Sequence, residues 1–476
     1  MSTIQVLTNG GAPAAISADD LAALGAALRG TVCLPGDAGY EEVRTIWNAM
    51  IDRRPGLVVR CAGAADVMAA VRFAADRDLL LSVRGGGHNI AGSALCDGGL
   101  TIDLSTMKAV HVDPKARTVR VEPGVSLGEM DHETQAFGLA VPAGINSTTG
   151  VAGLTLGGGF GWITRKYGLT VDNLLSADVV TAGGELVRAS ETEHPDLFWA
   201  LRGGGGNFGV VTSFQFRAHP VGPQVLSGLV VHPLEAAGEL LPAFRRIADA
   251  APDELTVWAV MRKAPPLPFL PAEWHGREVL IFAACYVGDL AAGEAAVAEL
   301  RALGSPIADV IGPHPFAGWQ QAFDPLLEPG ARNYWKSHDF VDLPAAATDR
   351  VVEAVWNLPS DETEIFIGHL GGAMARVPVE ATAFPQRASH FVMNVHTRWR
   401  DPADDDRCIA WARSLFDDTA PHAAGTAYVN FMPDDEGDRV ETAFGANFAR
   451  LGRVKAKYDP DNRFRVNHNI RPAAAA

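Results

Sequence analysis

The feature that most constrains this chain is a strand that runs directly into three consecutive glycines and a histidine. Residues 80–83 are apolar and β-competent, and Gly85, Gly86 and Gly87 follow shortly after them. A turn without side chains can adopt positive φ angles and bring several backbone N–H groups against one anion. The imidazole of His88 is then expected on the rim of that anion pocket. We interpret the stretch as a pyrophosphate loop whose histidine bonds to a flavin. The alternative is a plain glycine turn with a surface histidine.

Length, charge and cysteine content narrow the class of protein. The chain has 476 residues, of which 47% are hydrophobic, so it can form two globular domains with substantial cores. A net charge of −16 argues against nucleic acid or an anionic membrane as a partner. Five scattered cysteines without a CxxC pattern predict buried free thiols in a reducing compartment. The N-terminus lacks a signal-peptide pattern and no apolar run reaches ~18 residues, so we expect a cytoplasmic protein.

A second glycine-rich stretch covers residues 142–167. Its glycines are dense enough to let a large planar ligand lie directly on the backbone. Apolar side chains such as Leu154, Phe160 and Trp162 alternate with the glycines, which argues against a flexible linker.

A third glycine cluster, residues 203–206, is followed by Asn207, Phe208 and Gly209. It contains a formal GxGxxG pattern. A nicotinamide-binding fold needs that pattern between a strand and a following helix, so that the helix N-terminus faces the pyrophosphate. Here the predicted order is helix, glycines, strand. The sequence therefore argues against a dinucleotide-binding Rossmann fold.

The rest of the chain predicts two different architectures. Before residue 215, a strand at 57–60, a helix at 64–77 and the strand that enters the glycine loop form a β-α-β unit. Beyond residue 221, helices alternate with strands, which predicts an α+β domain with an antiparallel sheet. Its expected helices are 235–250, 290–303, 345–356 and 402–416, and its expected strands are 255–261, 279–287, 364–369 and 391–399. The last section predicts a strand at 428–431, a helix at 441–457 and an asparagine-rich tail at 458–471.

Several spaced motifs together resemble the vanillyl-alcohol-oxidase type of FAD-binding fold, in its berberine-bridge-enzyme-like branch. They are RGGGHN at 84–89, LGGGFG at 156–161, RGGGGNFG at 202–209, YVN at 428–430 and YDPDNRF at 458–464. The resemblance covers nearly the whole chain. It implies an α+β protein with a two-part FAD-binding domain of the vanillyl-alcohol-oxidase (PCMH) type, residues 1–215 and 421–476. Residues 216–420 would form a substrate-binding domain, an antiparallel sheet with helices on one face.

The same resemblance implies covalent FAD, attached through its 8α carbon to His88. Many relatives carry a second link from a cysteine in a Gly-x-Cys-Pro-Thr-x-Gly pattern, and here Asn146 occupies that place. We therefore predict a single covalent link. The position thought to gate oxygen falls on Thr149, which leaves oxidase and dehydrogenase activity both open. The residues predicted to bind FAD are Arg84, Gly85, Gly86, Gly87, His88, Asn89, Gly144, Asn146, Thr148, Thr149, Gly150, Gly153, Leu156, Gly157, Gly158, Gly159, Gly161, Trp162, Gly209, Val210, Val211, Asn430, Asn467 and Asn469.

The family reaction is hydride transfer from a small organic substrate (an alcohol, amine, sugar or natural product) to FAD, with O2 as acceptor and H2O2 as product. The alternatives are a dehydrogenase with another acceptor, and a flavin-binding protein with a decayed pocket. The decayed pocket is suggested by Phe431, where relatives often have a second tyrosine, and by the lack of the acid that relatives often carry on residues 390–399, where the matching place falls nearest Met393. No metal-binding pattern is present.

Three residues are candidates for catalysis. Tyr428 matches the family's Tyr-x-Asn pattern, and as a base it needs a pKa below the usual ~10 of tyrosine. Strand alternation places Asn394 and His396 on one face of residues 390–399, although a solvated strand face explains them equally well. No strong base is evident on that strand. His369, Tyr334 and Trp335 are weaker candidates for pocket residues, and core packing is the favoured role of Trp335.

Overall fold

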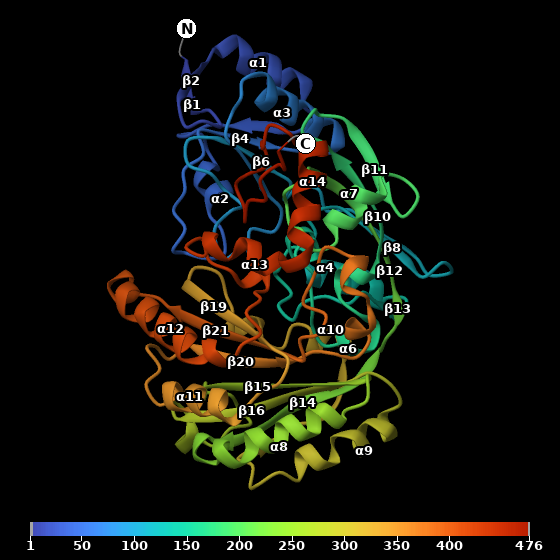
Figure 1. Cartoon of the computed structure of the whole chain (residues 1–476), viewed down its shortest axis with the longest axis vertical. Coiled ribbons are helices and arrows are strands. Elements are labelled where there is room, and N and C mark those ends of the chain that lie inside the picture. The colour runs from blue at the N-terminus through green and yellow to red at the C-terminus, as the bar shows by residue number, and fades with distance from the viewer. Residues whose placement is uncertain (1–2, 475–476) are drawn as a thin grey trace.

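The computed structural model describes residues 3–474 and is built from three main sheets (Figure 1). The first sheet has the order β3-β4-β6-β5, in which β4 and β5 run parallel to β6. A short hairpin and three helices accompany it. These elements are β1 (Ile4–Leu7), β2 (Pro13–Ile16), α1 (Ala18–Ala27), β3 (Thr31–Cys33), α2 (Tyr40–Arg44), β4 (Leu57–Arg60), α3 (Ala64–Asp76), β5 (Leu81–Arg84) and β6 (Leu100–Asp103).

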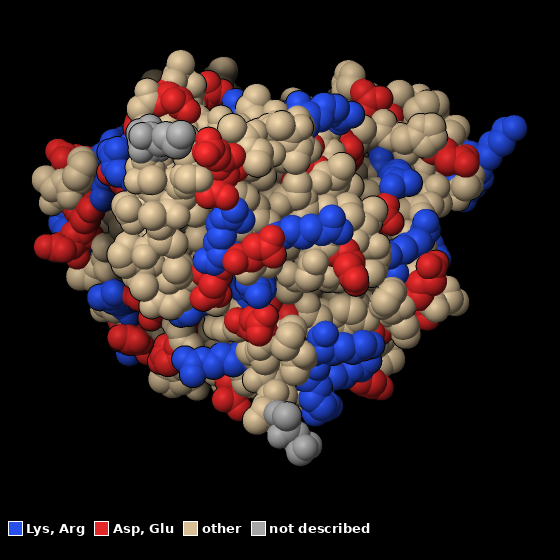
Figure 2. All heavy atoms as spheres, turned by 90° about the horizontal axis from the view of Figure 1, so that it is seen from above, with Lys and Arg blue, Asp and Glu red and all other residues tan. Residues whose placement is uncertain are grey.

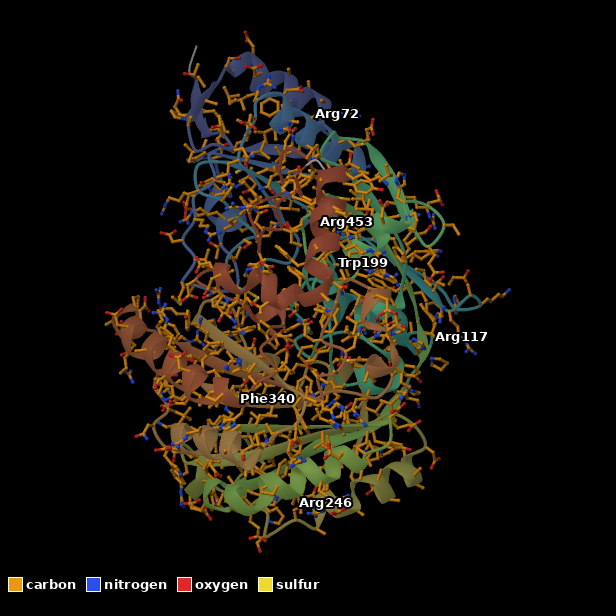
Figure 3. The ribbon with its side chains drawn as sticks, viewed as in Figure 1. Arg72, Arg117, Trp199, Arg246, Phe340 and Arg453 are labelled. Atoms are coloured by element: carbon orange, nitrogen blue, oxygen red, sulfur yellow. The ribbon has the colours of Figure 1, made fainter. Side chains whose placement is uncertain are left out.

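The second sheet has five antiparallel strands in the order β11-β10-β12-β8-β7. Arg117 lies in its β7–β8 turn, which projects from the molecule (Figure 3). The elements of this part are β7 (Val110–Asp113), β8 (Thr118–Val121), α4 (Leu127–Gln135), β9 (Leu139–Ala140), α5 (Val151–Leu156), α6 (Thr164–Tyr167), β10 (Leu174–Val180), β11 (Leu186–Ser190), α7 (Pro195–Leu201), β12 (Val210–Arg217) and β13 (His219–Pro220). The third glycine cluster lies between α7 and β12, so the predicted order of helix, glycines and strand is confirmed.

The third sheet has eight strands, and every pairing in it is antiparallel. Its main order is β17-β14-β16-β15-β20-β21-β19, and β18 pairs with β14. Two of its long strands, β14 and β19, are absent from the sequence prediction. The elements are β14 (Gln224–Pro233), α8 (Ala237–Ala250), β15 (Leu255–Lys263), β16 (Glu278–Tyr286), α9 (Leu290–Arg301), β17 (Ala308–Asp309), β18 (Gly312–Pro315), α10 (Phe316–Trp319), β19 (Arg332–Phe340), α11 (Ala345–Val355), β20 (Glu364–His369), β21 (Phe391–Trp399) and α12 (Asp405–Thr419).

Alternation along these strands separates two faces of the eight-stranded sheet. One face buries Val257, Phe340 and Met393 against α8, α11 and α12, so the predicted sheet with helices on one face is confirmed (Figures 1 and 3). The other face presents Trp258 and Val392 to the rest of the molecule. That second face forms one wall of the candidate site.

The C-terminal segment returns to the N-terminal half, where α14 (Phe448–Tyr458) packs on α7 beside Trp199 (Figures 1 and 3). Residues 429–431 form a 3₁₀ turn, so the predicted strand at 428–431 is wrong. The single helix predicted at 441–457 is also wrong. Gly445 has φ 50° and divides it into α13 (Val440–Phe444) and α14 (Phe448–Tyr458).

Basic and acidic side chains are interleaved over the face seen in Figure 2, without a continuous basic patch. Partly exposed ion pairs of the described residues include Arg77 with Asp20 and Lys457 with Asp196. Within residues 3–474, no helix is long and apolar enough to cross a membrane.

Candidate active site

The three glycine runs meet at one large cavity. Gly86 lies so close to the second run that a Cβ placed on it would be 2.5 Å from the Cα of Gly150. The Gly205 N–H of the third run donates to the Leu156 carbonyl at 2.9 Å. The cavity therefore lies where backbone segments far apart in sequence approach one another without side chains between them.

The close approach at Gly86 can be tested by substitution. Gly86→Ala places a methyl group against backbone atoms of Gly150, so one of the two loops must move. We expect the free energy of unfolding to fall by about 1–3 kcal/mol and the bound flavin to decrease. Gly238→Ala in α8 is the matched control, because no atom lies within 4 Å of the added Cβ. Equal flavin content and stability in both variants would contradict this account of the loop.

Most of the predicted FAD-binding residues line this cavity. From the first run and its neighbours they are Gly85, Gly86, Gly87, His88 and Asn89. From the second and third runs they are Gly144, Asn146, Thr149, Gly150, Gly153, Leu156, Gly209, Val210 and Val211. From the C-terminal segment they are Asn430 and Asn467. The three catalytic candidates, Asn394, His396 and Tyr428, line the same cavity.

The remaining predicted residues lie outside the cavity wall, and their part in FAD binding stays a prediction. The Arg84 guanidinium donates to the Val43 carbonyl. Trp162 is fully buried in a core cluster, where its ring stacks on Trp258 at 4.6 Å. Thr148 contacts the site through His88 and Asn146. The other residues outside the wall are Gly157, Gly158, Gly159, Gly161 and Asn469.

Close packing against neighbouring protein atoms explains why residues 157, 159 and 161 are glycines. A Cβ on Gly157 would lie 2.1 Å from Asn430 Oδ1, and one on Gly159 would lie 2.2 Å from Thr170 Oγ1. One on Gly161 would lie 2.1 Å from the Ala143 carbonyl oxygen. Their small size admits these neighbouring protein atoms.

The His88 ring is held from two sides. Trp47 stacks on it with ring centroids 4.9 Å apart and planes at 21°, and Thr148 Oγ1 lies 2.8 Å from its Nε2. Enclosure by the cavity wall lowers the pKa of His88 to about 3. The imidazole is therefore neutral at ordinary pH, as a nucleophile must be.

The sheet side of the cavity carries a row of residues that are direct neighbours across four strands. Arg262 on β15 pairs with Glu364 on β20, Glu364 with His396 on β21, and His396 with Trp335 on β19. Arg262 Nη1 donates to Glu364 Oε2 at 2.5 Å, and His396 Nδ1 lies 3.4 Å from Glu364 Oε1. The row places an ionisable pair, Glu364 and His396, in the wall of the cavity.

The ionisation of this pair follows from its surroundings. Burial opposes the charged form of Glu364, but Arg262 and His396 outweigh it and lower the pKa of the carboxyl to about 2. Burial lowers the pKa of His396 in spite of the opposing attraction of Glu364. The pair therefore combines a carboxylate with a neutral imidazole, an arrangement that can accept a proton.

Tyr428 does not have the properties of a base. Its hydroxyl oxygen accepts hydrogen bonds from the Gly159 N–H at 3.0 Å and from Asn430 Nδ2 at 2.9 Å. Burial nevertheless raises the pKa of Tyr428 to about 12, which is opposite to the shift that a base needs. With its pKa raised, this side chain is expected to be a neutral phenol at ordinary pH.

Asn394 is buried in the cavity wall, and neither atom of its amide has a hydrogen-bond partner. A solvated strand face therefore does not explain Asn394 or His396. Trp335 lines the cavity, whereas His369 lies elsewhere and bonds to Arg165 Nη1 at 2.8 Å. The unpaired amide of Asn394 is available to a ligand.

Several cavity residues have no counterpart in the sequence prediction. Trp47 precedes β4 in a loop without a recognisable motif, and Glu364 is the one acidic residue of an apolar strand. A buried acid paired with Arg262 on the neighbouring strand is visible only once the register is known. The wall also includes Trp258 and Phe366, which no motif singles out. Gly204, Gly205, Gly206, Asn207, Phe464 and His468 lie in the predicted third glycine cluster and tail, although they are not among the residues predicted individually to bind FAD. Within residues 3–474, no group of three or more His, Cys, Asp or Glu side chains is placed to hold a metal ion.

Two family models match the chain. The one described as "FAD binding domain" matches residues 55–190, and the one described as "Berberine and berberine like" matches residues 427–471. The two matched segments contain the first two glycine runs and the C-terminal segment of the cavity wall.

The chain is also similar to known proteins over nearly all of its length. The (R)-6-hydroxynicotine oxidase of Paenarthrobacter nicotinovorans is 33% identical, with 94% of this chain and 97% of that protein covered. The FAD-linked oxidoreductase YgaK of Bacillus subtilis is 31% identical at the same coverage. Among solved structures, 6-hydroxy-D-nicotine oxidase from Arthrobacter nicotinovorans has a TM-score of 0.83 at 29% identity, covering 94% of this chain and 98% of that one. The chitooligosaccharide oxidase structure has a TM-score of 0.83 at 25% identity, covering 95% and 100%.

These matches confirm the resemblance read from the motifs and the α+β fold that it implied. The chain belongs to the berberine-bridge-like family of FAD-linked oxidoreductases.

Proposed function

We propose that this protein is an oxidase that transfers a hydride from a small organic substrate to FAD held covalently by His88, with O2 as electron acceptor and H2O2 as product. The observation that carries the proposal is the single cavity that joins the glycine runs and His88 to the Glu364–His396 pair. When bound there, FAD would supply the hydride acceptor, at N5 of its ring.

The residues of the wall suit different parts of the cofactor. The backbone of Gly85, Gly86 and Gly87 offers N–H groups for the pyrophosphate. Asn467 Oδ1 is buried and has no hydrogen-bond partner, so it can accept from a polar group of the cofactor. Because the second and third runs expose backbone rather than side chains, a large flat ring can lie directly against them.

The other side of the cavity suits substrate oxidation. The Glu364–His396 pair takes the proton of the substrate O–H or N–H group while hydride leaves the neighbouring carbon. The Asn394 amide orients the substrate, and Tyr428 donates a hydrogen bond as a phenol. Phe160, Trp258, Phe366 and Phe431 give the pocket apolar walls that exclude water. Glu364 supplies the acidic group whose apparent absence suggested a decayed pocket.

We extend the proposal to the organisation of the chain. Residues 1–215 with 421–476 form the FAD-binding part, because α14 packs on α7 and Asn430 and Asn467 complete the cavity wall. Residues 216–420 form the substrate-binding part around the eight-stranded sheet. A cytoplasmic location is supported by the five cysteines, which are all buried and unpaired.

The names of relatives include oxidases of (R)-6-hydroxynicotine and of chitooligosaccharides. A pocket bounded by aromatic side chains, with one ionisable pair and one unpaired amide, is compatible with small ring compounds of either kind. We therefore propose a small organic alcohol, amine or sugar as substrate.

Two measurements test this function. We expect the purified protein to keep its yellow colour after acid precipitation, and a proteolytic peptide containing His88 to carry the mass of FAD. The peptide containing Asn146 should carry none. Aerobic turnover of a substrate that bleaches the flavin anaerobically should consume O2 and release H2O2 in equal amounts. Bleaching without oxygen consumption would identify a dehydrogenase instead, and flavin found only in the acid supernatant would disprove the covalent link.

A further inference from the structure

Hydrogen bonds link His88, the candidate attachment site, to the side chain of Thr148 and link Thr148 in turn to the side chain of Asn146. Thr148 Oγ1 lies 2.8 Å from His88 Nε2 and 2.8 Å from Asn146 Oδ1. Asn146 Oδ1 also accepts the Thr148 backbone N–H at 3.1 Å. Because that backbone group can only donate, it fixes which end of the Asn146 side chain is the oxygen.

The direction of these hydrogen bonds decides the tautomer of His88. An amide oxygen only accepts, so the single hydroxyl proton of Thr148 is donated to Asn146. The hydroxyl oxygen must then accept from His88, which requires the imidazole proton to be on Nε2. A neutral imidazole with its proton on Nε2 has its free electron pair on Nδ1.

The remaining contacts of His88 agree with this assignment. The ring is neutral in its partly enclosed position, and Trp47 holds its plane by stacking. Trp47 is itself anchored, since its Nε1 donates to the Leu327 carbonyl at 2.8 Å. Ring plane, tautomer and charge state are therefore all set by neighbouring side chains before any bond forms.

We propose that Asn146 and Thr148 are positioning residues for covalent attachment of FAD, which orient His88 so that Nδ1 is the atom that bonds. The inference rests on the proposed function, because it presumes that His88 is the attachment site. Asn146 stands where many relatives have a second flavin-linking cysteine. Here its proposed role in flavin attachment is to orient His88 rather than to form a bond itself.

Covalent attachment is an oxidation of the 8α methyl group, and dioxygen is the final electron acceptor. A C–H bond of the 8α methyl group breaks and a bond from Nδ1 to that carbon forms. The proton goes to solvent, and the electron pair of the broken bond stays on the flavin ring. Dioxygen then takes those two electrons with two protons and becomes H2O2. Alkylation leaves a positive charge on the imidazole, which is relieved when the Nε2 proton leaves toward Thr148, an exposed residue in contact with water.

The test compares variants that keep or remove the chain of hydrogen bonds. Thr148→Val and Asn146→Leu remove it, whereas Thr148→Ser and Asn146→Asp keep an acceptor at the same place. Each protein is incubated with FAD in air, and acid-stable flavin is measured against time. We expect the first pair to attach flavin about tenfold more slowly, the size of effect that one lost hydrogen bond produces. The second pair should attach it at nearly the wild-type rate.

A second readout is the linkage itself. NMR of the flavin-bearing peptide from the wild-type protein should show the 8α carbon bonded to Nδ1. Attachment at Nε2, or an unchanged rate in Thr148→Val and Asn146→Leu, would overturn the inference. If wild-type His88 carries no flavin at all, the proposed covalent link itself fails. Equal melting temperatures of the four variants exclude misfolding as the cause of slow attachment.

Discussion

Replacing Glu364 by glutamine is expected to slow anaerobic reduction of the flavin by substrate at least about 100-fold, because a positioned base contributes roughly 10²–10⁴ to a rate. Glutamine keeps the size of the side chain and can still accept the hydrogen bond from Arg262, but it removes the negative charge beside His396. Stopped-flow measurement at saturating substrate isolates the reductive step. The carboxyl is ionised far below neutrality, since its pKa is lowered to about 2. The deficit should therefore be similar at about pH 6 and about pH 9.

A matched control uses the same sheet. Glu278→Gln makes the identical chemical change at the start of β16, away from the cavity wall, and should leave the rate of reduction unchanged. If Glu364→Gln reduces its flavin at the wild-type rate, the ionisable pair takes no part in proton transfer. A rate loss restored at high pH would instead assign the base to a group that titrates there.

The largest expected effect on stability concerns a buried ion pair in the C-terminal segment. Lys455 and Asp459 are both fully buried, with Nζ 2.6 Å from Oδ2. Lys455 Nζ also donates to the carbonyls of Asn207 and Phe464, at 2.7 and 2.9 Å. Lys455→Met leaves the Asp459 charge buried without its partner, so we expect the free energy of unfolding to fall by about 3–5 kcal/mol. Urea unfolding followed by circular dichroism measures this difference.

The same helix provides the control for this prediction. Lys457 pairs with Asp196 at 2.7 Å, and its side chain is 58% exposed. Lys457→Met should cost no more than about 1 kcal/mol, as is usual for exposed ion pairs. Because Asn207 and Phe464 both line the cavity, Lys455→Met should also retain less flavin than Lys457→Met. Similar losses in the two variants would show that the buried pair does not hold the tail against the third glycine run.

The sequence predicts much of this fold because its signals are local. Alternation along residues 391–399 correctly placed Asn394 and His396 on the face opposite Met393, since successive strand residues point to opposite sides. The order of helix, glycine cluster and strand, seen as α7 and β12 in the structure, argues against the Rossmann fold from the sequence alone. Both features are encoded by residues that are close together in the sequence, so a local pattern is enough to predict them.

The failures have non-local causes. The charge of Glu364 is set by Arg262 on one adjacent strand and His396 on the other. Which strands lie next to each other cannot be predicted from any local sequence pattern. Trp162 adjoins glycines in the sequence, whereas its burial and its stacking on Trp258 arise only from tertiary packing. Tyr428 illustrates a third limit. Its identity is evident from the sequence, whereas its raised pKa depends on burial by residues distant along the chain.

The wall of the cavity combines residues from both ends of the polypeptide, and this has a consequence for biosynthesis. Gly86 and Gly150 emerge from the ribosome early, but Asn430, Phe464 and Asn467 emerge only after the entire eight-stranded sheet. Domains fold as the chain is made, from the N-terminus onward. The coenzyme therefore has no complete enclosure until residues 430–467 have been made, and its capture is a late event in maturation. A polypeptide that ends before residue 430 should accordingly fail to retain the yellow coenzyme.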